Sequence, residues 1–489
     1  MPLPELKLAS LICLCAIVYF HFFSPTSTYI NYLPNEQDPT HPLTFPKSKQ
    51  VSNSTSFFYN NNNNQVNWHK VHAHNQPLVF RKFKPTQSWK SVQHWNASLL
   101  ATKWKTIRAQ FVPSDSDLTV KMLSFVQPFG RVSELSWNAA WNEKTVSGLE
   151  FFSQTQQTTT PLMYLFAPVE KLPRHFHSDF GRLELLGDDN SGIDSAGFWS
   201  GPPGVASPLH YDAAHNAYLQ IFGYKRFLLF PTHVSDTLYC HSRLHPSTRS
   251  SFINVRKVAR HRFPLFEQAL NNSNALHSLH PLEVVLGPGD VLYIPPYYWH
   301  RASVIGTEMS MSLAVYSTSK IMEKYDILKS YPIPIDKKWL WSRRVAGLKI
   351  YICALARLFD TSITCTSWIS NLLTSRYTSM HLDPLKQNIV NANKLKNWSY
   401  KNKRIFLWKT NNNVVVPKHV EEQLMKHALN LKSRLQLRDG KIEKEEMVSK
   451  DIWKIELKSL AEDIVNFVLG SGFVECFFYW MNEELSWKE

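Results

Sequence analysis

The middle of the chain alternates between short apolar runs and breaker residues, a pattern that predicts strands. Two aromatic-rich runs, 216–222 and 224–230, are joined by a single glycine, which predicts a hairpin. A third run, 291–294, follows the glycine-rich turn 287–290 and stops at two prolines, as a buried strand does. The segment 76–319 is therefore expected to form a mainly β domain.

After residue 319 the spacing of the apolar residues changes from one typical of strands to one typical of helices. Helices are predicted over 325–331, 339–359, 361–373, 420–435 and 452–469. The last two end at glycines, which predicts a helical hairpin. Basic residues interrupt 339–359, so this helix is expected to be amphipathic and not membrane-spanning. Residues 320–489 are therefore interpreted as a helical C-terminal region.

The first 23 residues contain an uncharged apolar stretch, 8–23, which is typical of a signal anchor or a signal peptide. No clear cleavage site follows, so an uncleaved anchor is favoured over a cleaved signal peptide, with a cytosolic amphipathic leader as a third alternative. Residues 24–75 are rich in Ser, Thr, Pro and Asn, which predicts a disordered tether. We expect a single-pass membrane protein with its catalytic domain in the lumen of the endoplasmic reticulum or Golgi, or a secreted protein if the leader is cleaved.

Charge and cysteine content narrow this picture only slightly. The 54 basic and 39 acidic residues give a net charge of +15, which is compatible with nucleic acid, an anionic membrane or an acidic protein as partner. Acceptor motifs for N-glycosylation occur at Asn53, Asn96, Asn271 and Asn397. The six cysteines form no C-x-x-C motif, which argues against a zinc ribbon and a thioredoxin-like site, and they leave one or two disulfides of unknown pairing.

The candidate chemistry is concentrated at Leu209-His210-Tyr211-Asp212. On a strand, side chains two residues apart leave the same face, so His210 and Asp212 would point at one spot. Two histidines and one carboxylate on one face suit Fe(II) for oxygen chemistry, and His300 is the natural third ligand. A lone H-x-D is more often part of an ordinary surface strand, but the rigid apolar strands around both histidines favour a metal site.

Three motifs in this segment together resemble the JmjC and cupin-8 family of Fe(II)- and 2-oxoglutarate-dependent oxygenases. They are H-Y-D at 210–212, G-Y-K-R-F-L-L-F-P at 223–231 and G-P-G-D-V-L-Y-I-P-x-x-x-W-H at 287–300. The sequence is most similar to the branch that includes the asparaginyl hydroxylase acting on hypoxia-inducible factor. The resemblance implies a double-stranded β-helix core, that is, a jelly roll with flanking helices, and a homodimer formed through C-terminal helices.

The resemblance also implies 2-oxoglutarate as co-substrate and assigns residues to it. Lys225 matches the lysine for the distal carboxylate, and Tyr164 and Ser207 match positions whose hydroxyls reach the same carboxylate. Asn216 matches an asparagine that the asparaginyl hydroxylase keeps in its active site. Ala314 stands where that enzyme has a second asparagine, so its substrate cannot be transferred to this chain.

The leading prediction is therefore an Fe(II)/2-oxoglutarate-dependent dioxygenase that hydroxylates a protein in the secretory pathway, attached to the membrane by its N-terminal anchor. One alternative is a catalytically silent binding module of the same fold. Another is a JmjC demethylase, against which the leader and the lack of a zinc finger argue. A Golgi glycosyltransferase, suggested by the D-x-D at 115–117, is a weaker alternative. The sequence holds no motif specific for nucleic acid.

Overall fold

The computed structural model describes twelve stretches of the chain, all within one compact unit, Leu43–Glu489. These are residues 49–50, 66–112, 143–154, 162–187, 195–244, 247–255, 262–271, 279–359, 363–377, 416–437, 450–470 and 473–486. The predicted leader, most of the predicted tether, the D-x-D at 115–117, and the glycosylation motifs at Asn53 and Asn397 lie outside the described residues.

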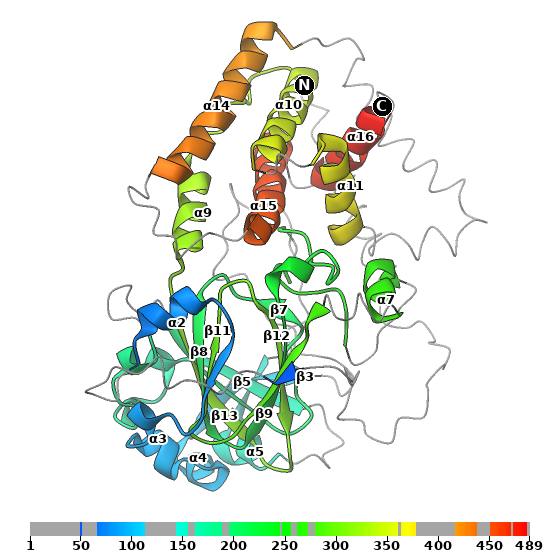
Figure 1. Cartoon of the computed structure of the whole chain (residues 1–489). Helices are drawn as coiled ribbons and strands as arrows, with labels where there is room; N and C mark the ends of the chain where they lie inside the picture. The colour runs from blue at the N-terminus through cyan, green and yellow to red at the C-terminus, as the bar shows by residue number, and fades with distance from the viewer. Residues whose placement is uncertain are drawn as a thin grey trace, which may run out of the picture. The chain divides into compact units, whose positions relative to one another are not determined.

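Two β-sheets form the core of the domain (Figure 1). The larger sheet has the spatial order β2 (Leu78–Phe80), β11 (Val291–Ile294), β8 (His215–Phe222), β13 (Ser310–Ser317), β6 (Ser195–Gly201), β5 (Leu162–Pro168), β3 (Thr106–Val112) and β4 (Glu143–Ser147). The smaller sheet has the order β1 (Lys49–Gln50), β10 (Leu282–Leu286), β9 (Tyr224–Phe230), β12 (Trp299–Ile305) and β7 (His210–Tyr211). Neighbouring strands are antiparallel except for β1 and β10. The predicted mainly β jelly-roll core is confirmed.

Side chains from both sheets fill the space between them, because alternate residues of each strand point inward. The apolar members of this interior cluster are Val79, Phe227, Leu229, Val284, Leu286, Leu292, Ile294 and Ala314. Tyr218 of β8 belongs to the same cluster, and Lys225 is two residues before Phe227 on β9. Polar groups on these inward rows are therefore enclosed by the barrel.

Gly223 marks a corner between the two sheets. β8 ends before it in the larger sheet and β9 begins after it in the smaller one, so the predicted hairpin is wrong. The backbone φ of Gly223 is +67°, and a Cβ atom there would lie 2.3 Å from the carbonyl oxygen of Met309, so only glycine fits this corner. The composition signals two strands and a tight turn, but it does not reveal that the turn leads into another sheet.

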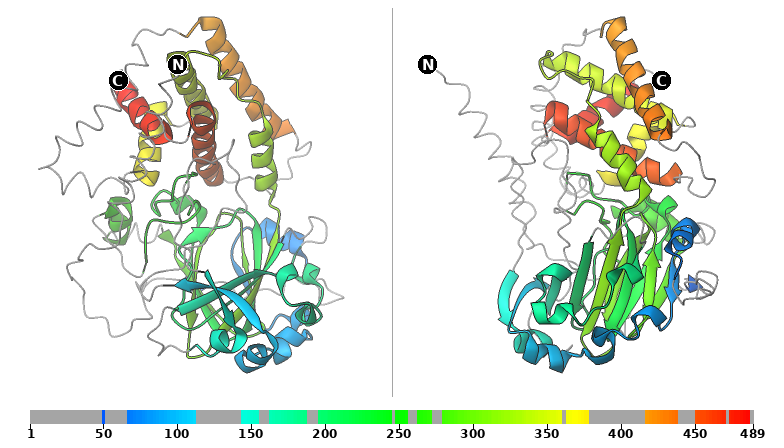
Figure 2. Two further views of the ribbon diagram at one scale, coloured as in Figure 1. Left: turned by 180° about the vertical axis from the view of Figure 1, so that it is seen from behind. Right: turned by 90° about the vertical axis from the view of Figure 1, so that its left-hand side faces the viewer.

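Short helices cover the outer face of the larger sheet (Figure 2). They are α2 (Trp68–His74), α3 (Lys90–His94), α4 (Ala97–Lys103), α5 (Gly148–Phe152) and α6 (Arg174–His177), with the short 3-10 turns η2 (Lys84–Thr86), η4 (Val169–Lys171) and η5 (Leu183–Leu186). Trp68 and Val71 of α2 are buried in this layer. The predicted tether therefore ends earlier than residue 75, because two large apolar side chains of that stretch belong to the core.

The stretch between β9 and β10 contains η6 (Thr232–Val234) and α7 (Pro264–Asn271). Part of it extends the smaller sheet beyond β7: Ser250 forms an isolated β-bridge with His210, and the amide of Ser251 donates to the carbonyl of Leu209 over 2.8 Å. The strand that carries the first metal-ligand candidate is therefore paired on both edges.

The C-terminal region is helical, as predicted. It contains α9 (Lys320–Ser330), α10 (Trp341–Phe359), α11 (Cys365–Arg376), α14 (Lys418–Leu437), α15 (Lys450–Leu469) and α16 (Val474–Ser486), and these helices share one apolar core. α14 and α15 each pack against α10, so the predicted hairpin between them is wrong. A disulfide joins Cys353 of α10 to Cys365 at the start of α11, a pairing that the sequence left open.

None of the described helices is by itself long and apolar enough to cross a membrane. α15 and α16 meet the requirement only when they are taken together, across a bend of 107°.

Candidate active site

Three side chains with metal-ligand chemistry meet at one end of the smaller sheet. His210 on β7 and His300 on β12 are direct cross-strand partners, and Asp212 follows β7. One ligand atom from each residue lies within 4.8 Å of the other two. Nε2 of His300 is 3.6 Å from Oδ2 of Asp212. Two imidazoles and one carboxylate at this spacing fit a single metal ion held on one face.

Backbone carbonyls orient both imidazole rings. Nδ1 of His210 lies 2.8 Å from the carbonyl oxygen of Pro208, and Nδ1 of His300 lies 3.1 Å from that of Tyr298. Because a carbonyl oxygen can only accept, each Nδ1 must carry the proton. Nε2 of each ring then keeps its lone pair, which is the tautomer that metal binding through Nε2 requires.

The surroundings of His300 favour its neutral imidazole form. Burial lowers the pKa of His300 to about 4, and repulsion from His210 adds to this effect while Asp212 opposes it. The Asp212 carboxylate accepts a hydrogen bond of 3.3 Å from Nδ2 of Asn216, which fixes its orientation. Asn216 is paired with Tyr316 on the neighbouring strand, and its Oδ1 is buried without a hydrogen-bond partner among the described residues. That oxygen is an acceptor available to a ligand.

Lys225 lies in the same barrel interior as the metal-ligand candidates, but further along the strands. On β12 its cross-strand partner is Val304, four residues beyond His300, which corresponds to roughly 13 Å along the strand. Its side chain is buried, with only 1% of the residue's surface exposed. The ammonium donates to the hydroxyl of Tyr218 over 2.6 Å.

The charge of Lys225 is not balanced by an acid. Among the described residues no carboxylate forms an ion pair with it, and burial alone lowers its pKa to about 7. A desolvated cation without a counter-ion is unfavourable unless an anion joins it. The barrel interior therefore contains a site suited to an anionic ligand.

Of the two hydroxyl candidates, Tyr164 lies near this cation, and Ser207 contacts a residue of β12 between His300 and Val304. Nζ of Lys225 is 5.9 Å from the centre of the Tyr164 ring. Gly201 makes room for that ring, because a Cβ atom at this position would lie 2.4 Å from its Cδ2. Oγ of Ser207 accepts a hydrogen bond of 3.0 Å from the amide of Ala302. Ala302 is paired with Phe227, and along the two strands this pair lies between the pair that contains His300 and the pair that contains Lys225.

Sequence reasoning missed Tyr218 and Tyr316. Both occupy inward positions: Tyr316 pairs with Asn216 on the neighbouring strand, and Tyr218 is two residues after Asn216 on β8. Strand alternation supplies the signal that could have found Tyr218, since Asn216 and Tyr218 must share a face. Tyr316 required the register between β8 and β13, which the sequence does not state.

Comparison with known proteins places these residues within a described family. Residues 63–317 match the family model for the cupin-like domain. The match begins before the predicted domain start at residue 76 and so includes α2.

Three curated proteins show similarity to shorter parts of the chain. "JmjC domain-containing protein D" of Dictyostelium discoideum is 34% identical over 25% of this chain and 25% of that protein. "Lysine-specific demethylase JMJ30" of Arabidopsis thaliana is 26% identical over 35% of this chain and 38% of that protein. "Jumonji C domain-containing protein 5" of Drosophila melanogaster is 25% identical over 48% of this chain and 56% of that protein. The chain thus spans between a quarter and just over half the length of these relatives.

Proposed function

Since this chain belongs to the cupin-like domain family, we propose that it is an Fe(II)- and 2-oxoglutarate-dependent dioxygenase that hydroxylates a protein substrate. The observation that carries this proposal is the buried, uncompensated Lys225 in the same barrel interior as His210, Asp212 and His300. A histidine and carboxylate cluster alone suits several metal ions. The additional buried ammonium favours a site that also binds a carboxylate ligand.

Two sets of residues would bind the metal and the co-substrate, respectively. His210, Asp212 and His300 would hold Fe(II) from one side, and the bound ion would supply the oxygen-activating chemistry. Lys225 would neutralise the distal carboxylate of 2-oxoglutarate, with the hydroxyls of Tyr164 and Ser207 as further donors. These residues set the geometry of the site.

Three neighbouring residues support that geometry. Asn216 donates to Asp212 and so holds this carboxylate in the orientation in which it would bind the metal. Phe227 and Leu229 line the barrel interior beside Lys225 and exclude water from the contact with the co-substrate.

The test is to purify the protein anaerobically, load it with Fe(II) and measure oxygen-dependent decarboxylation of 2-oxoglutarate. We expect turnover, and we expect mass spectrometry of candidate protein substrates to show the gain of one oxygen atom. Metal binding without any 2-oxoglutarate binding would instead favour a silent binding module. Wild-type protein that binds neither would remove the proposal.

Demethylation is the second candidate, because one relative is named a lysine-specific demethylase. The two reactions differ in product: a demethylase removes a methyl group from its substrate, whereas a hydroxylase leaves the added oxygen in place. The motifs favour the branch of the asparaginyl hydroxylase, and Asn216 retains a hydrogen bond to the metal-ligand candidate Asp212. Ala314 offers no polar group at the second position, so we do not extend the proposal to asparagine as the target residue.

We also propose that the catalytic domain lies in the secretory lumen. The disulfide Cys353–Cys365 is of the kind that persists in oxidising compartments. Asn96 is exposed, and its Oδ1 caps α4 by accepting from the amide of Leu99, so a glycan on Nδ2 is compatible with the cap. Glycosidase treatment should shift the mobility of protein from eukaryotic cells, and Asn96→Gln should reduce that shift. A protease-sensitive, unglycosylated domain in intact microsomes would place it in the cytosol.

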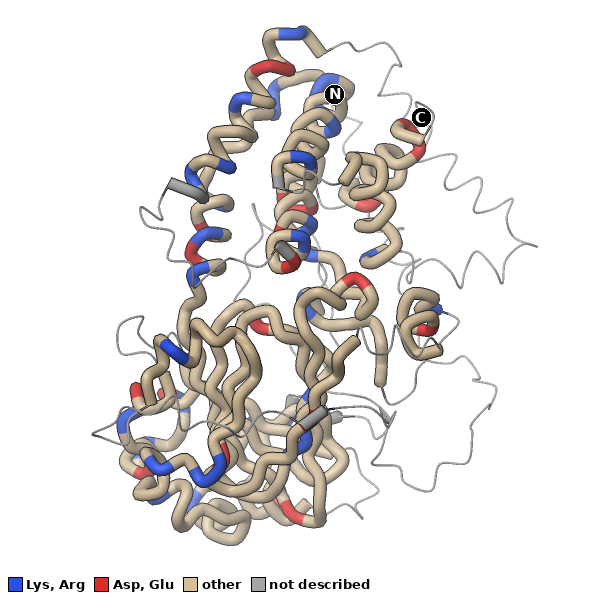
Figure 3. The backbone as a smooth tube through the Cα atoms, viewed as in Figure 1, with Lys and Arg blue, Asp and Glu red and all other residues tan. Residues whose placement is uncertain are grey.

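A homodimer through the C-terminal helices remains our proposal for the oligomeric state. Met425 and Leu429 stand one turn apart on α14 and are 39% and 51% exposed. Leu429→Glu should convert a dimer to a monomer in light scattering, whereas an unchanged mass would argue against this face. In the described part of the chain, Lys and Arg occur in both the β domain and the C-terminal helices (Figure 3).

A further inference from the structure

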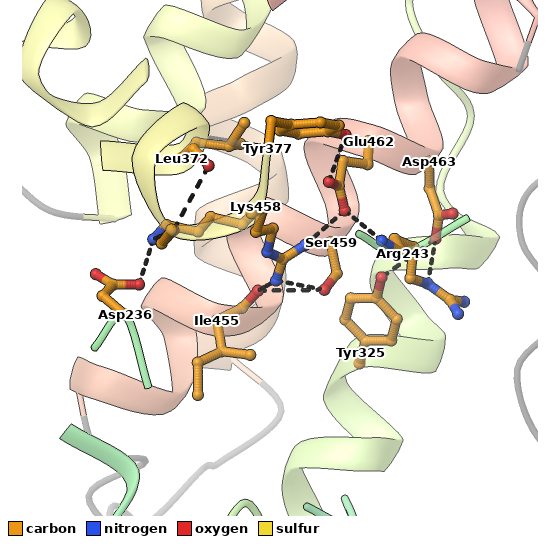
Figure 4. Close-up of polar contacts among 12 residues, drawn as sticks. Asp236, Arg243, Tyr325, Leu372, Tyr377, Ile455, Lys458, Ser459, Glu462 and Asp463 are labelled. Carbon is orange, nitrogen blue, oxygen red and sulfur yellow. Dashed lines mark hydrogen bonds and ion pairs between the residues drawn. The ribbon is translucent and has the colours of Figure 1, made fainter. Parts of the chain in front are cut away.

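A network of charged side chains joins the C-terminal helix α15 to the stretch between β9 and β10 (Figure 4). The backbone amide of Arg243 donates to Oε2 of Glu462 over 2.7 Å, and its guanidinium contacts Asp463 at 3.2 Å. Arg376 of α11 pairs with Glu462, and Lys458 pairs with Asp236. We call these residues, together with Glu456 and Arg249, the α15 network.

The helix that carries the α15 network packs against the strands of the metal-ligand candidates, on the face opposite to these ligands. Ile452 and Ile455 of α15 are buried in the same apolar cluster as Tyr211, Tyr297 and Trp299. Tyr211 stands between His210 and Asp212 in the sequence, and Trp299 directly precedes His300. The side chains that alternate with the ligands along β7 and β12 therefore pack against α15.

Tyr297 links α15 to Asp212 most directly. Its backbone amide donates to the carbonyl oxygen of Asp212 over 2.6 Å, and its ring stacks on Tyr211 with centroids 5.3 Å apart. Its φ is +62°, a left-handed conformation that is unfavourable for a bulky aromatic residue and needs support from its surroundings. Burial raises the pKa of the Tyr297 hydroxyl well above its usual value, and the nearby carboxylate of Glu456 on α15 raises it further.

Glu456 is well placed to support the left-handed backbone conformation of Tyr297. It is buried, with 3% of its surface exposed, and Arg249 and Arg243 attract its negative charge. Arg249 belongs to the segment that pairs with β7, since its carbonyl accepts from the amide of Tyr211 over 3.0 Å. Glu456 thus interacts electrostatically with both the turn before His300 and the segment beside His210.

We propose that Glu456 is a positioning residue of the metal centre: through the Tyr297 hydroxyl it holds the turn at Pro295–Tyr298, and through the Tyr297 amide that turn fixes Asp212. The helical C-terminal region would then be a working part of the active site and not an appended module. The inference rests on the proposed function in so far as it concerns a metal centre.

The test compares Glu456→Gln with Glu462→Gln in the full-length protein. Both changes replace a buried carboxylate of α15 by its neutral isostere, but Glu462 contacts Arg243, Arg376 and Tyr377 and not Tyr297. Two readouts are needed: titration with Co(II) followed by its absorption spectrum, and hydrogen exchange of the Tyr297 amide in the metal-free protein.

We expect Glu456→Gln to weaken Co(II) binding by about 10- to 100-fold, the range typical of lost outer-shell partners, and to speed exchange at Tyr297. Tyr297→Phe should do the same, and the double variant should be little worse than either single variant because both remove the same interaction between Glu456 and the Tyr297 hydroxyl. Glu462→Gln should lower stability while leaving both readouts at the wild-type level.

Co(II) affinity and Tyr297 exchange that change equally in Glu456→Gln and Glu462→Gln would overturn the positioning role. Wild-type protein that binds no Co(II) would overturn the proposed function and the metal-centre role together. In that case the exchange readout still decides whether Glu456 holds Tyr297, so the two failures are distinguishable.

Discussion

The ammonium of Lys225 and the hydroxyl of Tyr218 meet at 2.6 Å inside the barrel, although their strands belong to different sheets. Lys225 projects from β9 in the smaller sheet and Tyr218 from β8 in the larger one, so the pair bridges the interior. The hydroxyl supplies one acceptor but no charge. This leaves the cation dependent on an anionic ligand for full compensation.

The pH dependence of 2-oxoglutarate binding should reveal this dependence. Burial lowers the pKa of Lys225 to about 7 in the ligand-free protein, and a bound carboxylate favours the charged ammonium, so binding above about pH 7 must take up a proton. Affinity should therefore fall by up to about tenfold per pH unit above that point. Calorimetry in buffers of different ionisation enthalpy measures the proton uptake directly, and a pH-independent affinity would contradict the buried-lysine site.

The same shift affects stability, with a sign that follows from proton counting. The folded-state pKa is below the unfolded value near 10.5, so the unfolded chain binds more protons between about pH 7 and 10.5. The Lys225 contribution to the free energy of unfolding should accordingly increase as pH rises through this window. Lys225→Met should flatten the curve, and this control separates Lys225 from other titrating groups.

Removal of the cation gives a second prediction. Lys225→Ala deletes a charge-assisted contact to a desolvated carboxylate, which should cost about 2 to 3 kcal/mol, or roughly 30- to 100-fold in 2-oxoglutarate affinity. Tyr218→Phe keeps the charge and removes one neutral hydrogen bond, so its effect should be only about 0.5–1.5 kcal/mol. Metal affinity should be unchanged in both variants. Equal 2-oxoglutarate affinity in wild type and Lys225→Ala would move the silent-module alternative ahead.

Much of the β domain could be predicted because its signals are local. The turn 287–290, the prolines after β11 and the aromatic runs that became β8 and β9 each mark an element by composition. The assignment of β8 and β9 to two sheets was not accessible, because sheet membership depends on non-local pairing. Gly223 signals a turn equally well in a hairpin and in a corner.

The candidate site likewise contains residues that local sequence predicts and residues that depend on non-local packing. His210 and Asp212 are close in sequence, and strand geometry alone brings them together. The proposed role of Glu456 could not be predicted, because several helices separate it from Tyr297 in the sequence and it belongs to no motif. A buried carboxylate on a helix resembles a surface carboxylate until the packing of that helix is known.

Loss of a metal ligand gives the third prediction. Asp212→Ala removes the only carboxylate of the cluster and leaves His210 and His300, so metal affinity should fall by more than the roughly 10- to 100-fold typical of an outer-shell change. The barrel should remain folded, because Asp212 is not part of the apolar interior. Metal content and circular dichroism measured on the same sample check both statements. Full metal occupancy in Asp212→Ala would remove the assignment.

The disulfide Cys353–Cys365 gives the fourth prediction. It closes a loop with a sequence separation of 12 residues and ties α10 to α11 within the C-terminal apolar core. Constraint of the unfolded chain by a loop of this length corresponds to about 3 kcal/mol, so Cys353→Ser with Cys365→Ser should lower the free energy of unfolding by roughly 2 to 3 kcal/mol in chemical denaturation.

A reducing agent should produce a similar loss in the wild type and none in the double variant. Cys476→Ser, which changes a partly buried cysteine outside the disulfide, is the control and should have a smaller effect. Equal stability of oxidised wild type and the double variant would show that the packing of α10 on α14 and α15 holds this region without the crosslink.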